Sequence, residues 1–581
     1  MVIKRRRAFL SLTAVVAAAA LTVPLLGVGA ISAASAAAKP RQATTSLPRN
    51  ETLYSTGMSY TAGNFNPNQP GNYSFGTEGL LYETLYLYNP IKNTYIPWLA
   101  QSGSWTTPTT YALTIRNNIT WTDGTPMTAQ DVAFTINLAS TDPGIYYSSL
   151  AADVKSVSVT GTDSLVVTFN HPSSEDWQQF LYSDPILPQH IMGTWSNTEL
   201  NTSMNATPVG SGPFTLYSTN AEEVVYTVNP KWWGTTDLGV HFAFTYWANI
   251  TSPSNNVSLS DLLQDQVDLD NNELAGISTL VASPISTGNL SGTGGFNLET
   301  YYPKSPYMLS ANTVWLEPNL IKAPTSNLNF RKAVAYAIDP QQIVQIDYAG
   351  IVAAANPTGL MPSQFPYLDK AALAKYGFSY NVALAKKYLA MSGYKHQVVT
   401  IECPTGWTDW MGGIEIVVND LKAVGINAKA YFPSYAARTS DLEDGTFDFA
   451  LDNNATIAAD PYAYFYREFR LPISKVQSAQ DNMERANNPT AWALVQKLNS
   501  TPPTDTSARL ALFGQLETIE LQTLPEIPLW YNGAWAQYNT SVWTNWPSST
   551  NPSNQYTPVT WGGWLGNMTT ILAVAQLKLA S

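Results

Sequence analysis

The amino-acid sequence predicts a mixed α/β protein built from at least two domains, and three observations point to this. The chain has 581 residues, more than one compact core normally accommodates. Patterns of alternating polarity, typical of strands with one buried face, recur in the first half, whereas helical patterns alternate with short strands from about residue 310. In the second half, a helical pattern between two strand patterns forms a strand-helix-strand unit, which predicts parallel pairing.

The N-terminal residues have the composition of a secretory signal. Basic residues 4–7 precede an almost wholly apolar run over 9–31, and small residues at 34–38 offer cleavage sites. We therefore expect a signal peptide over 1–38 and a short linker over 39–50. The alternative is an uncleaved anchor, because the apolar run is long enough to cross a bilayer. No cysteine follows the run, so lipid attachment is not expected, and we expect an extracytoplasmic protein, secreted or held at the outer face of the cell membrane.

Composition limits the partners that the protein can have. Charged residues make up only 12% of the chain, while there are 18 Trp and 32 Tyr, so polarity comes mainly from neutral groups. The formal charge is −12, and loss of the signal peptide would make it −16, which disfavours binding to nucleic acid phosphates. The low charge density also suits an acidic medium. The single cysteine, Cys403, cannot form an internal disulfide and is expected to be a small core residue.

The clearest stretch of the first half predicts a strand, a turn and a helix in succession. Residues 111–115 alternate in polarity as a strand does. Asp123 and Gly124 then favour a turn, and Thr128 stands three residues before Asp131, an acidic variant of the capping box that begins a helix. The apolar residues that follow have helical spacing.

Shorter patterns predict the other elements of the first half. We expect strands at 52–60, 160–170, 214–216 and 224–228, the last two as a hairpin, and a helix at 78–87. The first strand ends in a turn-rich loop over 64–68. Asn66 in this loop is a candidate ligand contact, because loops at strand ends commonly carry function.

Patterns in the second half are those of helices and buried strands. We expect helices at 329–338, at 383–391 with Gly393 as C-cap, and at 414–424, and strands at 397–402, 426–432 and 447–451. Asp339 and Pro340 stop the first of these helices and begin another. Ligands of open α/β sheets bind beyond the C-terminal ends of the strands, so the loops at 404–410 and 452–454 are candidate ligand contacts.

The sequence contains no recognisable catalytic pattern. The four histidines, His171, His190, His241 and His396, stand far apart and match no metal-binding spacing. No nucleophile elbow is present, and Cys403 has no evident base partner. We therefore expect no metal ligands, no cofactor and no enzymatic activity, and we favour reversible binding. A secreted carbohydrate-active enzyme is the alternative, because the 42 acidic residues offer many carboxylate pairs.

Four separated motifs resemble those of one family of transport proteins. They are residues 121–132 (W-x-D-G-x-P-x-T-A-x-D-V), 209–214 (V-G-x-G-P-F), 229–234 (N-P-x-W-W-G) and 331–339 (R-x-A-x-x-x-A-I-D). From about residue 50 to the C-terminus, the chain thus resembles the extracytoplasmic solute-binding proteins of ABC transporters, family 5, the oligopeptide- and dipeptide-binding type. Arg331 could hold a ligand, but we favour a structural pairing with a nearby carboxylate.

This resemblance implies an α/β, two-lobed fold of the type II periplasmic-binding-protein kind, with mixed sheets, a hinge and an extra subdomain in lobe I. Lobe I would comprise residues 45–308, with 526–581 returning to it, and lobe II residues 309–525. Closure of the lobes over an oligopeptide or oligosaccharide would give the form that an ABC permease and ATPase complex in the membrane recognises. The protein is expected to be a monomer.

The sequence departs from the family pattern at residues 448–461. Peptide binders of the family commonly show D-x-x-x-x-x-W-x-x-D-x-x-D-P there, and the middle Asp holds the α-ammonium of the peptide. Alignment without gaps puts Asn454 at the Trp and Ile457 at that Asp, while Asp460 is retained. A desolvated ammonium without a counter-charge is costly. The tail at 543–552 is similar to a W-P-x-x-x-N-P stretch of family members that bind β-linked oligosaccharides, so we lean slightly towards an oligosaccharide.

The candidate ligand contacts are aromatic and polar residues, because flat aromatic faces and neutral amides suit sugars. They are Asn66, Trp407, Asp409, Trp410, Asn453, Asn454, Trp535 and Trp546. A role in the core is the alternative for each tryptophan.

Overall fold

The computed structural model describes most of the chain after the expected signal. The described residues are 47–58, 63–69, 73–141, 150, 153–274, 276–282, 295–453, 457–477, 482–559 and 564–580. The expected signal peptide over 1–38, most of the expected linker and the candidate contact Asn454 lie outside them. Within the described ranges, no helix has both the length and the apolar character needed to cross a membrane.

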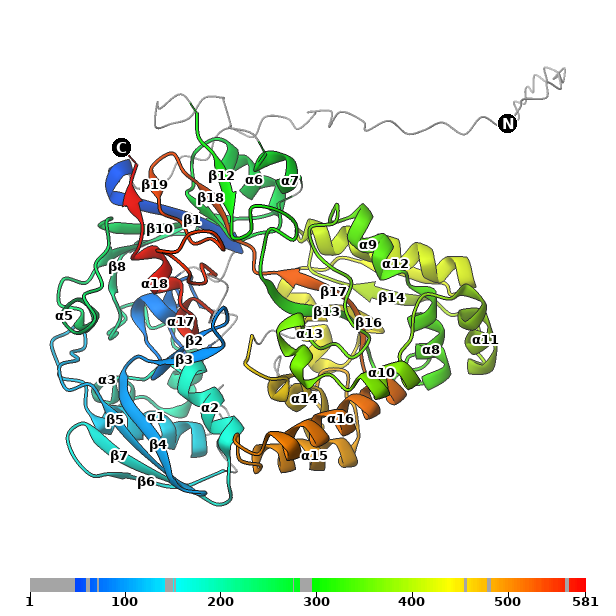
Figure 1. Ribbon diagram of the computed structural model, residues 1–581, viewed down its shortest axis with the longest axis horizontal. Coiled ribbons are helices and arrows are strands. Elements are labelled where there is room, and N and C mark those ends of the chain that lie inside the picture. Colours follow the sequence, from blue (N-terminus) through cyan, green and yellow to red (C-terminus); the bar gives the residue numbers. More distant parts are fainter. Residues whose placement is uncertain are drawn as a thin grey trace, which may run out of the picture. The chain divides into compact units, whose positions relative to one another are not determined.

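Twenty strands are assigned in the described ranges (Figure 1). They are β1 (Thr52–Met58), β2 (Tyr86–Asn89), β3 (Thr94–Pro97), β4 (Ala100–Thr107), β5 (Thr110–Ile115), β6 (Val154–Val159), β7 (Ser164–Phe169), β8 (Phe214–Thr219), β9 (Glu223–Val228), β10 (Tyr246–Ser252), β11 (Leu269–Asp270), β12 (Leu298–Thr300), β13 (Ser310–Pro318), β14 (Val399–Glu402), β15 (Ala428–Tyr431), β16 (Phe449–Asn453), β17 (Ile527–Gly533), β18 (Gln537–Asn539), β19 (Trp543–Thr544) and β20 (Lys578–Leu579).

The described helices range from single turns to eighteen residues. They are η1 (Arg49–Glu51), η2 (Thr77–Leu81), α1 (Ala129–Thr141), α2 (Ser174–Ser183), α3 (Gln189–Met192), α4 (Asn197–Thr202), α5 (Trp233–Asp237), α6 (Asn255–Leu263), α7 (Ile277–Leu280), α8 (Leu328–Ala337), α9 (Pro340–Ile346), η4 (Pro362–Tyr367), α10 (Lys370–Tyr376), α11 (Val382–Ser392), α12 (Thr408–Val424), α13 (Tyr435–Asp444), α14 (Tyr462–Phe469), α15 (Pro489–Asn499), α16 (Thr506–Thr523), α17 (Trp564–Asn567) and α18 (Thr570–Val574).

A seven-stranded mixed sheet is built from the first part of the chain and from its tail. Its strand order is β12-β18-β11-β1-β10-β9-β8. The first strand, β1, pairs in parallel with both β10 and β11, whereas β18 from the tail pairs antiparallel with β11 and β12. Figure 1 shows the blue β1 and the orange β18 in this sheet. The predicted hairpin is confirmed, because β8 and β9 pair antiparallel.

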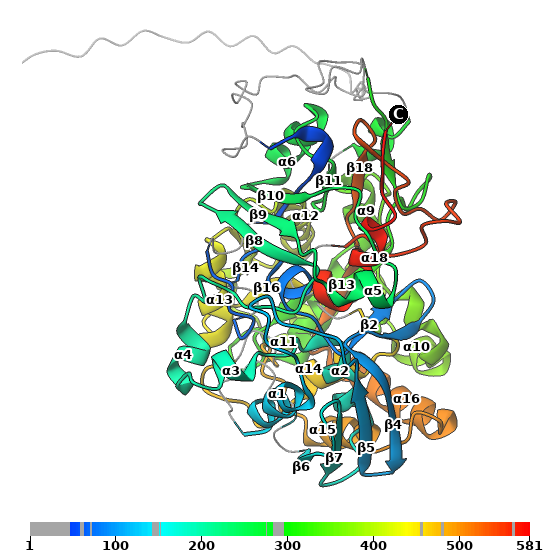
Figure 2. The same cartoon turned by 90° about the vertical axis from the view of Figure 1, so that its left-hand side faces the viewer.

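A four-stranded antiparallel sheet, in the order β4-β5-β7-β6, lies at the lower end of the view in Figure 2. The predicted strand, turn and helix are confirmed here. Gly124 turns the chain with a φ of 94°, which a residue without a Cβ adopts at little cost. The Asp131 carboxylate then accepts a hydrogen bond from the backbone N–H of Thr128 at 2.9 Å, at the beginning of α1.

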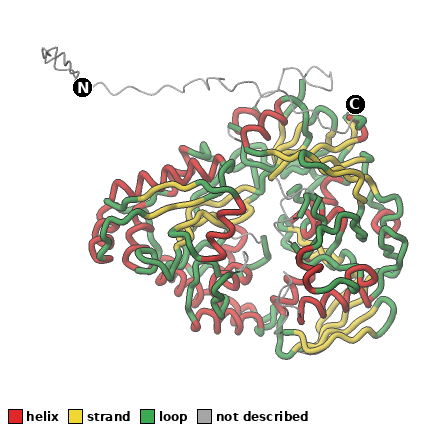
Figure 3. Tube along the Cα trace, turned by 180° about the vertical axis from the view of Figure 1, so that it is seen from behind, coloured by secondary structure: helices red, strands yellow, loops and turns green. Residues whose placement is uncertain are grey.

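A five-stranded sheet in the order β15-β14-β16-β13-β17 organises the second half. The predicted strand-helix-strand unit is confirmed, because β14 and β15 pair in parallel and α12 joins them. Alternate residues of β13 face opposite sides: Val314 packs with α8 and α12, whereas Trp315 packs with α14 and α16. Helices therefore cover both faces of this sheet, as Figure 3 shows. Cys403 is fully buried in the apolar core that Val314 shares with α8 and α12, as expected.

Two short segments connect the seven-stranded and five-stranded sheets: 301–309 between β12 and β13, and 534–536 between β17 and β18. They lie side by side, because the N–H of Ala534 donates to the carbonyl of Leu309 at 2.6 Å. Residues 527–533, which the prediction assigns to the tail of lobe I, lie as β17 in the five-stranded sheet. The tail reaches the seven-stranded sheet at β18. The bounds of the two lobes stay a prediction.

The helix predicted at 78–87 is wrong. Only the short turn η2 forms, with non-helical backbone at Glu78 and Gly79, and the chain then enters β2. Gly79 has a φ of 91°, and a Cβ there would lie 2.6 Å from the carbonyl oxygen of Leu565. Close backbone packing against the tail thus overrides the local helical pattern, a constraint that no short stretch of sequence reveals.

Arg331 is buried, but its partners are carbonyls rather than the expected carboxylate. Its guanidinium donates to the carbonyl oxygens of Thr325 at 2.9 Å, Thr523 at 2.6 Å and Leu524 at 2.8 Å. Thr523 ends α16, and Leu524 takes a left-handed φ of 47°. Arg331 therefore satisfies carbonyls that the end of α16 leaves unpaired.

Replacing Arg331 with Met should lower the free energy of unfolding by roughly 2–4 kcal/mol, because three buried carbonyls lose a charged donor while the aliphatic volume is kept. Chemical denaturation would measure the change. Lys386→Met, at an exposed position of α11, is the matched control. An Arg331→Met protein as stable as this control would contradict the capping role.

Buried carboxyl groups recur through the fold, and some of them are held by neutral donors rather than by arginines. The Glu83 carboxylate, 1% exposed, accepts hydrogen bonds from three indole N–H groups: those of Trp98 at 2.9 Å, Trp232 at 3.0 Å and Trp233 at 3.0 Å. Burial nevertheless raises the pKa of Glu83 to about 7, because the indole hydrogen bonds offset only part of the desolvation of the charge.

The protein should be more stable near pH 5 than near pH 8. Burial raises the pKa values of Glu83, Asp270 and Glu402 to about 7 and that of Glu517 to about 8. In the unfolded chain these acids lose their protons near pH 4, so between pH 4 and 7 the folded state binds more protons. Their stabilising contribution is complete below about pH 4 and is lost progressively as the pH rises to about 7, by about 3 kcal/mol for a group such as Glu83.

Calorimetric melting between pH 4 and 8, in a chelator and 0.3 M salt to screen surface repulsion, would measure this trend. A maximum of Tm near neutral pH would contradict both the prediction and the adaptation to an acidic medium.

Candidate functional site

Several predicted contacts meet at the beginning of α12. Gly406 turns the loop with a φ of 91°, and a Cβ there would lie 2.9 Å from the carbonyl oxygen of Pro253, so the loop passes close to the backbone beyond β10. Trp407 follows, half-buried, with its ring 4.8 Å from that of Trp410 and at 83° to it. Trp410 is buried at 3% exposure. The two rings therefore form an edge-to-face pair in which Trp407 stays partly exposed.

Asp409 connects this aromatic pair to the other sheet. One oxygen accepts from the Tyr348 hydroxyl at 2.9 Å, and the other accepts from the side-chain amide of Asn255 on α6 at 3.0 Å. The Tyr348 ring lies parallel to that of Trp535, with centroids 6.3 Å apart. Tyr348, Trp407, Asp409, Trp410 and Trp535 thus form one group, called the Trp407 cluster below.

The Trp407 cluster has an acidic border. Burial raises the pKa of Asp409, and the hydrogen bonds from Tyr348 and Asn255 oppose that rise. Burial, with the nearby charges of Asp409 and Asp347, raises the pKa of Glu273 well above its ordinary value. Carboxyl groups held close together in this way disfavour a further anion and suit neutral or cationic partners.

Two other predicted contacts, Asn66 and Trp546, are buried in the first part of the fold, and their side chains already contact other residues. The side-chain amide of Asn66 donates to the carbonyls of Leu200 and Ser203, each at 2.9 Å. Trp546 stacks on Tyr538 with centroids 4.8 Å apart and is 2% exposed. The structure does not bring either residue to the Trp407 cluster, because both side chains serve the packing of the sheet and tail.

Two residues at the end of β16 and after it, Asn453 and Ile457, bear on the predicted ligand contacts. Asn453 is half-buried, and its carbonyl accepts a hydrogen bond from Arg467. Ile457 is 6% exposed and packs into the apolar core of the first part of the chain, although its own loop belongs to the second half. The position where peptide binders of the family commonly carry an Asp is therefore an apolar contact between the two halves.

A charged contact between the two halves was not predicted. Arg509 on α16 donates to Glu175 on α2 at 2.5 Å and to Asp460, before α14, at 2.7 Å. Beside it, the Tyr462 hydroxyl donates to Asp176 at 2.8 Å. We call these five residues the Arg509 contact. Only the retained Asp460 hinted at it, since the partners come from three distant stretches of sequence.

Three tyrosines form a second aromatic group beside the Arg509 contact. Tyr88, Tyr95 and Tyr182 have ring centroids 5.1–5.9 Å apart. Burial raises the pKa of each, and the nearby Asp460 raises it further. Tyr95 is half-buried, so this group has a flat polar-edged face near the junction of the two halves.

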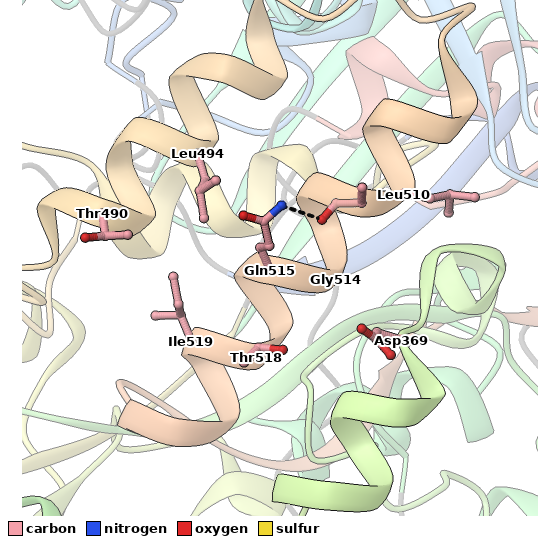
Figure 4. Close-up of a pocket in the computed structure, with 9 residues that line it drawn as sticks. Asp369, Thr490, Leu494, Leu510, Gly514, Gln515, Thr518 and Ile519 are labelled. Atoms are coloured by element: carbon pink, nitrogen blue, oxygen red, sulfur yellow. Dashed lines mark hydrogen bonds between the residues drawn. The ribbon is translucent and has the colours of Figure 1, made fainter.

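A hollow of about 410 Å³ lies elsewhere, between α10, α15 and α16 (Figure 4). Leucine, threonine and alanine side chains line most of it, and the Gln515 amide donates to the carbonyl of Ala511 across one turn. Asp369 at its rim is engaged as the N-cap of α10, where it accepts from the N–H groups of Ala371 and Ala372. None of the predicted contacts lines this hollow, so it is not the candidate site.

Comparisons with known proteins place the chain in a family. The family described as bacterial extracellular solute-binding proteins, family 5 middle, matches residues 94–471. A binding protein of Brucella melitensis is 32% identical over 125 residues, which cover 21% of this chain and 20% of that protein. The chain thus matches about one fifth of the length of that relative. The nickel-binding periplasmic protein of Escherichia coli is 24% identical over 473 residues, 77% of this chain and 81% of that protein.

Solved structures extend the similarity over nearly the whole chain. The oligopeptide-binding protein of a Thermotoga maritima ABC transporter, solved with mannohexaose bound, is 35% identical with a TM-score of 0.85, covering 92% of this chain and 99% of that one. The oligopeptide-binding protein of Bacillus subtilis, solved with a nonapeptide, shares the fold at 18% identity and a TM-score of 0.71, covering 91% of this chain and 99% of that one. The mixed α/β fold is therefore the two-lobed type II fold that the motifs implied, and the chain belongs to family 5 of the bacterial extracellular solute-binding proteins, which bind solutes and are not enzymes.

Proposed function

We propose that this protein is the solute receptor of an ABC importer and binds an oligosaccharide between two lobes. Lobe I would comprise residues 45–308 with the tail after β17, and lobe II residues 309–525 with β17. The two sheets, joined by 301–309 and 534–536, support this division. Closure over the ligand would give the form that a membrane permease with its ATPase recognises. The protein would act outside the cytoplasm as a monomer, with no nucleic acid partner.

The preference for sugar over peptide depends chiefly on Ile457. An apolar residue, buried against lobe I at this position, offers no counter-charge for a peptide ammonium. The Trp407 cluster offers instead a half-buried indole face beside a carboxylate and an amide, the partners that sugar rings and hydroxyls use. The 35% identical Thermotoga protein, solved with mannohexaose, supports the same preference.

An oligopeptide remains the second candidate because of the acidic border of the Trp407 cluster. Glu273, Asp347 and Asp409 bring three carboxyl groups into electrostatic contact. An ammonium group placed among them would find the counter-charge that Ile457 does not supply. A peptide would thus use the carboxyl groups of this cluster as counter-charges, whereas a sugar would use its aromatic and neutral polar groups.

Mannohexaose and cello-oligosaccharides should raise the Tm of the purified protein and bind in calorimetry, whereas mixed peptides should not. Trp407→Ala should weaken sugar binding about tenfold, because an aromatic stacking contact contributes about 0.5–1.5 kcal/mol beyond the apolar area that it buries. Tyr380→Ala removes a 48% exposed aromatic residue elsewhere and is the matched control. Binding of peptides alone would refute the sugar proposal, and sugar cleavage during the titration would refute a pure binding role.

Arg509→Met should loosen the contact between the lobes. The substitution leaves the Glu175 and Asp460 carboxyl groups facing each other without their cation, which favours separation. We expect a larger radius of gyration in small-angle scattering and an apparent ligand affinity about tenfold weaker, since less of the protein is closed. Lys497→Ala, at an exposed position of the neighbouring α15, should change neither. Unaltered scattering and affinity in Arg509→Met would show that the contact does not control closure.

A further inference from the structure

Three glutamates meet inside lobe II, away from the Trp407 cluster. Glu468 lies on α14, Glu520 on α16, and Glu526 immediately before β17 of the five-stranded sheet. Figure 1 shows α14 and α16 beside this sheet. One carboxylate oxygen from each lies within 4.8 Å of the other two. Each residue is at most 1% exposed. The three side chains therefore point their charged ends into one small interior space.

The turn after α16 fixes this geometry. Glu520 lies in the last turn of α16, and the left-handed backbone of Leu524 reverses the chain so that Glu526 returns towards it. Arg331 holds the carbonyls of Thr523 and Leu524. The approach of the two carboxyl groups is thus built into a capped turn and does not depend on flexible side chains alone.

Protein cations do not balance these three charges. Within the described ranges, no Lys or Arg forms an ion pair with Glu468, Glu520 or Glu526. The Arg467 guanidinium attracts the Glu526 carboxyl group from a distance, but its ion pairs are with Asp452 at 3.1 Å and Glu317 at 3.9 Å. In the described part of the chain no hydrogen bond of normal geometry reaches the oxygens of Glu468 or Glu520, and the Tyr464 hydroxyl is the neutral donor that interacts with Glu520. Buried carboxylates without donors or counter-charge cost several kcal/mol each.

Tyr464 supplies an independent indication of a ligand. It precedes Glu468 by four residues on α14, so both side chains lie on one face of the helix. Its hydroxyl is buried at 1% exposure and makes no hydrogen bond of normal geometry to a described residue, although it lies close enough to the Glu520 carboxyl group to interact with it. The carboxyl groups of Glu520, Glu468 and Glu526 act on it, next to burial, in raising the pKa of the phenol. The hydroxyl oxygen therefore faces the three carboxyl groups.

Gly359 makes room for this hydroxyl. A Cβ at residue 359 would lie 2.4 Å from the Tyr464 oxygen. The φ of Gly359 is 72°, a conformation that side-chain-bearing residues rarely adopt. The backbone opposite Tyr464 is thus shaped to keep an oxygen in this place.

We propose that Glu468, Glu520, Glu526 and Tyr464 bind a hard divalent cation of the calcium class. The donors are all oxygens, and three glutamates can offer up to six of the six to eight that Ca²⁺ takes. Without imidazole or thiolate groups, the set does not suit Zn²⁺ or Cu²⁺. The ion would tie α14, α16 and the beginning of β17 together, a structural role separate from solute binding.

Calcium should raise the Tm of the chelator-treated, desalted protein by several degrees at pH 7.5. Glu520→Gln and Glu526→Gln should abolish this rise, because each removes one anionic ligand. Glu402→Gln is the matched control: Glu402 is another buried carboxyl group of the same sheet, 2% exposed, and its variant should respond to calcium as the native protein does. A calcium response that persists in both ligand variants would place the ion elsewhere and overturn the proposal.

A direct measurement covers the case in which the variants fail to fold. The native protein, dialysed against calcium, should retain one ion per chain in elemental analysis. Tb³⁺ should show luminescence on excitation of Tyr464 and of Trp315, whose ring lies 5.6 Å from that of Tyr464, and calcium should quench it by displacement. Absence of a retained ion and of sensitised luminescence would overturn the proposal. The proposal would also be overturned if Glu520→Gln is more stable than the native protein in chelator and calcium changes the Tm of neither protein.

Discussion

The antiparallel pairing of β13 with β17 holds the fold together. The chain leaves the seven-stranded sheet through 301–309 and enters β13, and it returns from β17 through 534–536. These adjacent strands therefore carry both connections between the sheets. The hydrogen bond from Ala534 to Leu309 extends the pairing into the connections themselves. A movement of one lobe against the other must therefore be absorbed in two neighbouring segments, which is the geometry of a hinge.

The same pairing sets the position of the candidate site. Trp535 follows β17 within the connection and stacks on Tyr348, which in turn holds Asp409. Asn255, on the other side of the junction, completes the hydrogen bonds of that carboxylate. The Trp407 cluster thus lies where the two sheets are joined, and residues of both halves contribute to it. The Arg509 contact joins the halves at a second place, through α2 and α16.

Local patterns predicted much of the fold because they are read from neighbours in sequence. The turn at Gly124, the hairpin of β8 and β9, and the parallel pair β14 and β15 follow from short-range spacing and were confirmed. The stretch at 78–87 failed because the tail packs on the backbone of Gly79, a contact across nearly 500 residues. The expected carboxylate partner of Arg331 failed for a similar reason, since the unpaired carbonyls belong to a distant helix end.

The site was predictable only where its residues share a loop. Trp407, Asp409 and Trp410 were found because they follow one strand, and Trp535 was included for its aromatic character alone. Glu175 and Arg509 gave no signal, since 334 residues separate them. The three glutamates of lobe II give no signal in the sequence, because they come from separate elements and share no regular spacing.

Charge composition explains why buried acids here find unusual partners. The chain has 42 acidic residues and only 30 Lys and Arg, so carboxyl groups drawn into the interior cannot all meet a cation of the protein. Indole N–H groups satisfy Glu83, and a tyrosine and an amide satisfy Asp409. Around Glu468 and Glu520 the Tyr464 hydroxyl cannot satisfy four carboxylate oxygens, so a bound proton or a bound metal ion is needed to offset the desolvation of the charge. A proton neutralises one carboxyl group at a time, whereas a divalent ion also draws three of them together, and the convergence of Glu468, Glu520 and Glu526 with the Tyr464 hydroxyl matches the second solution.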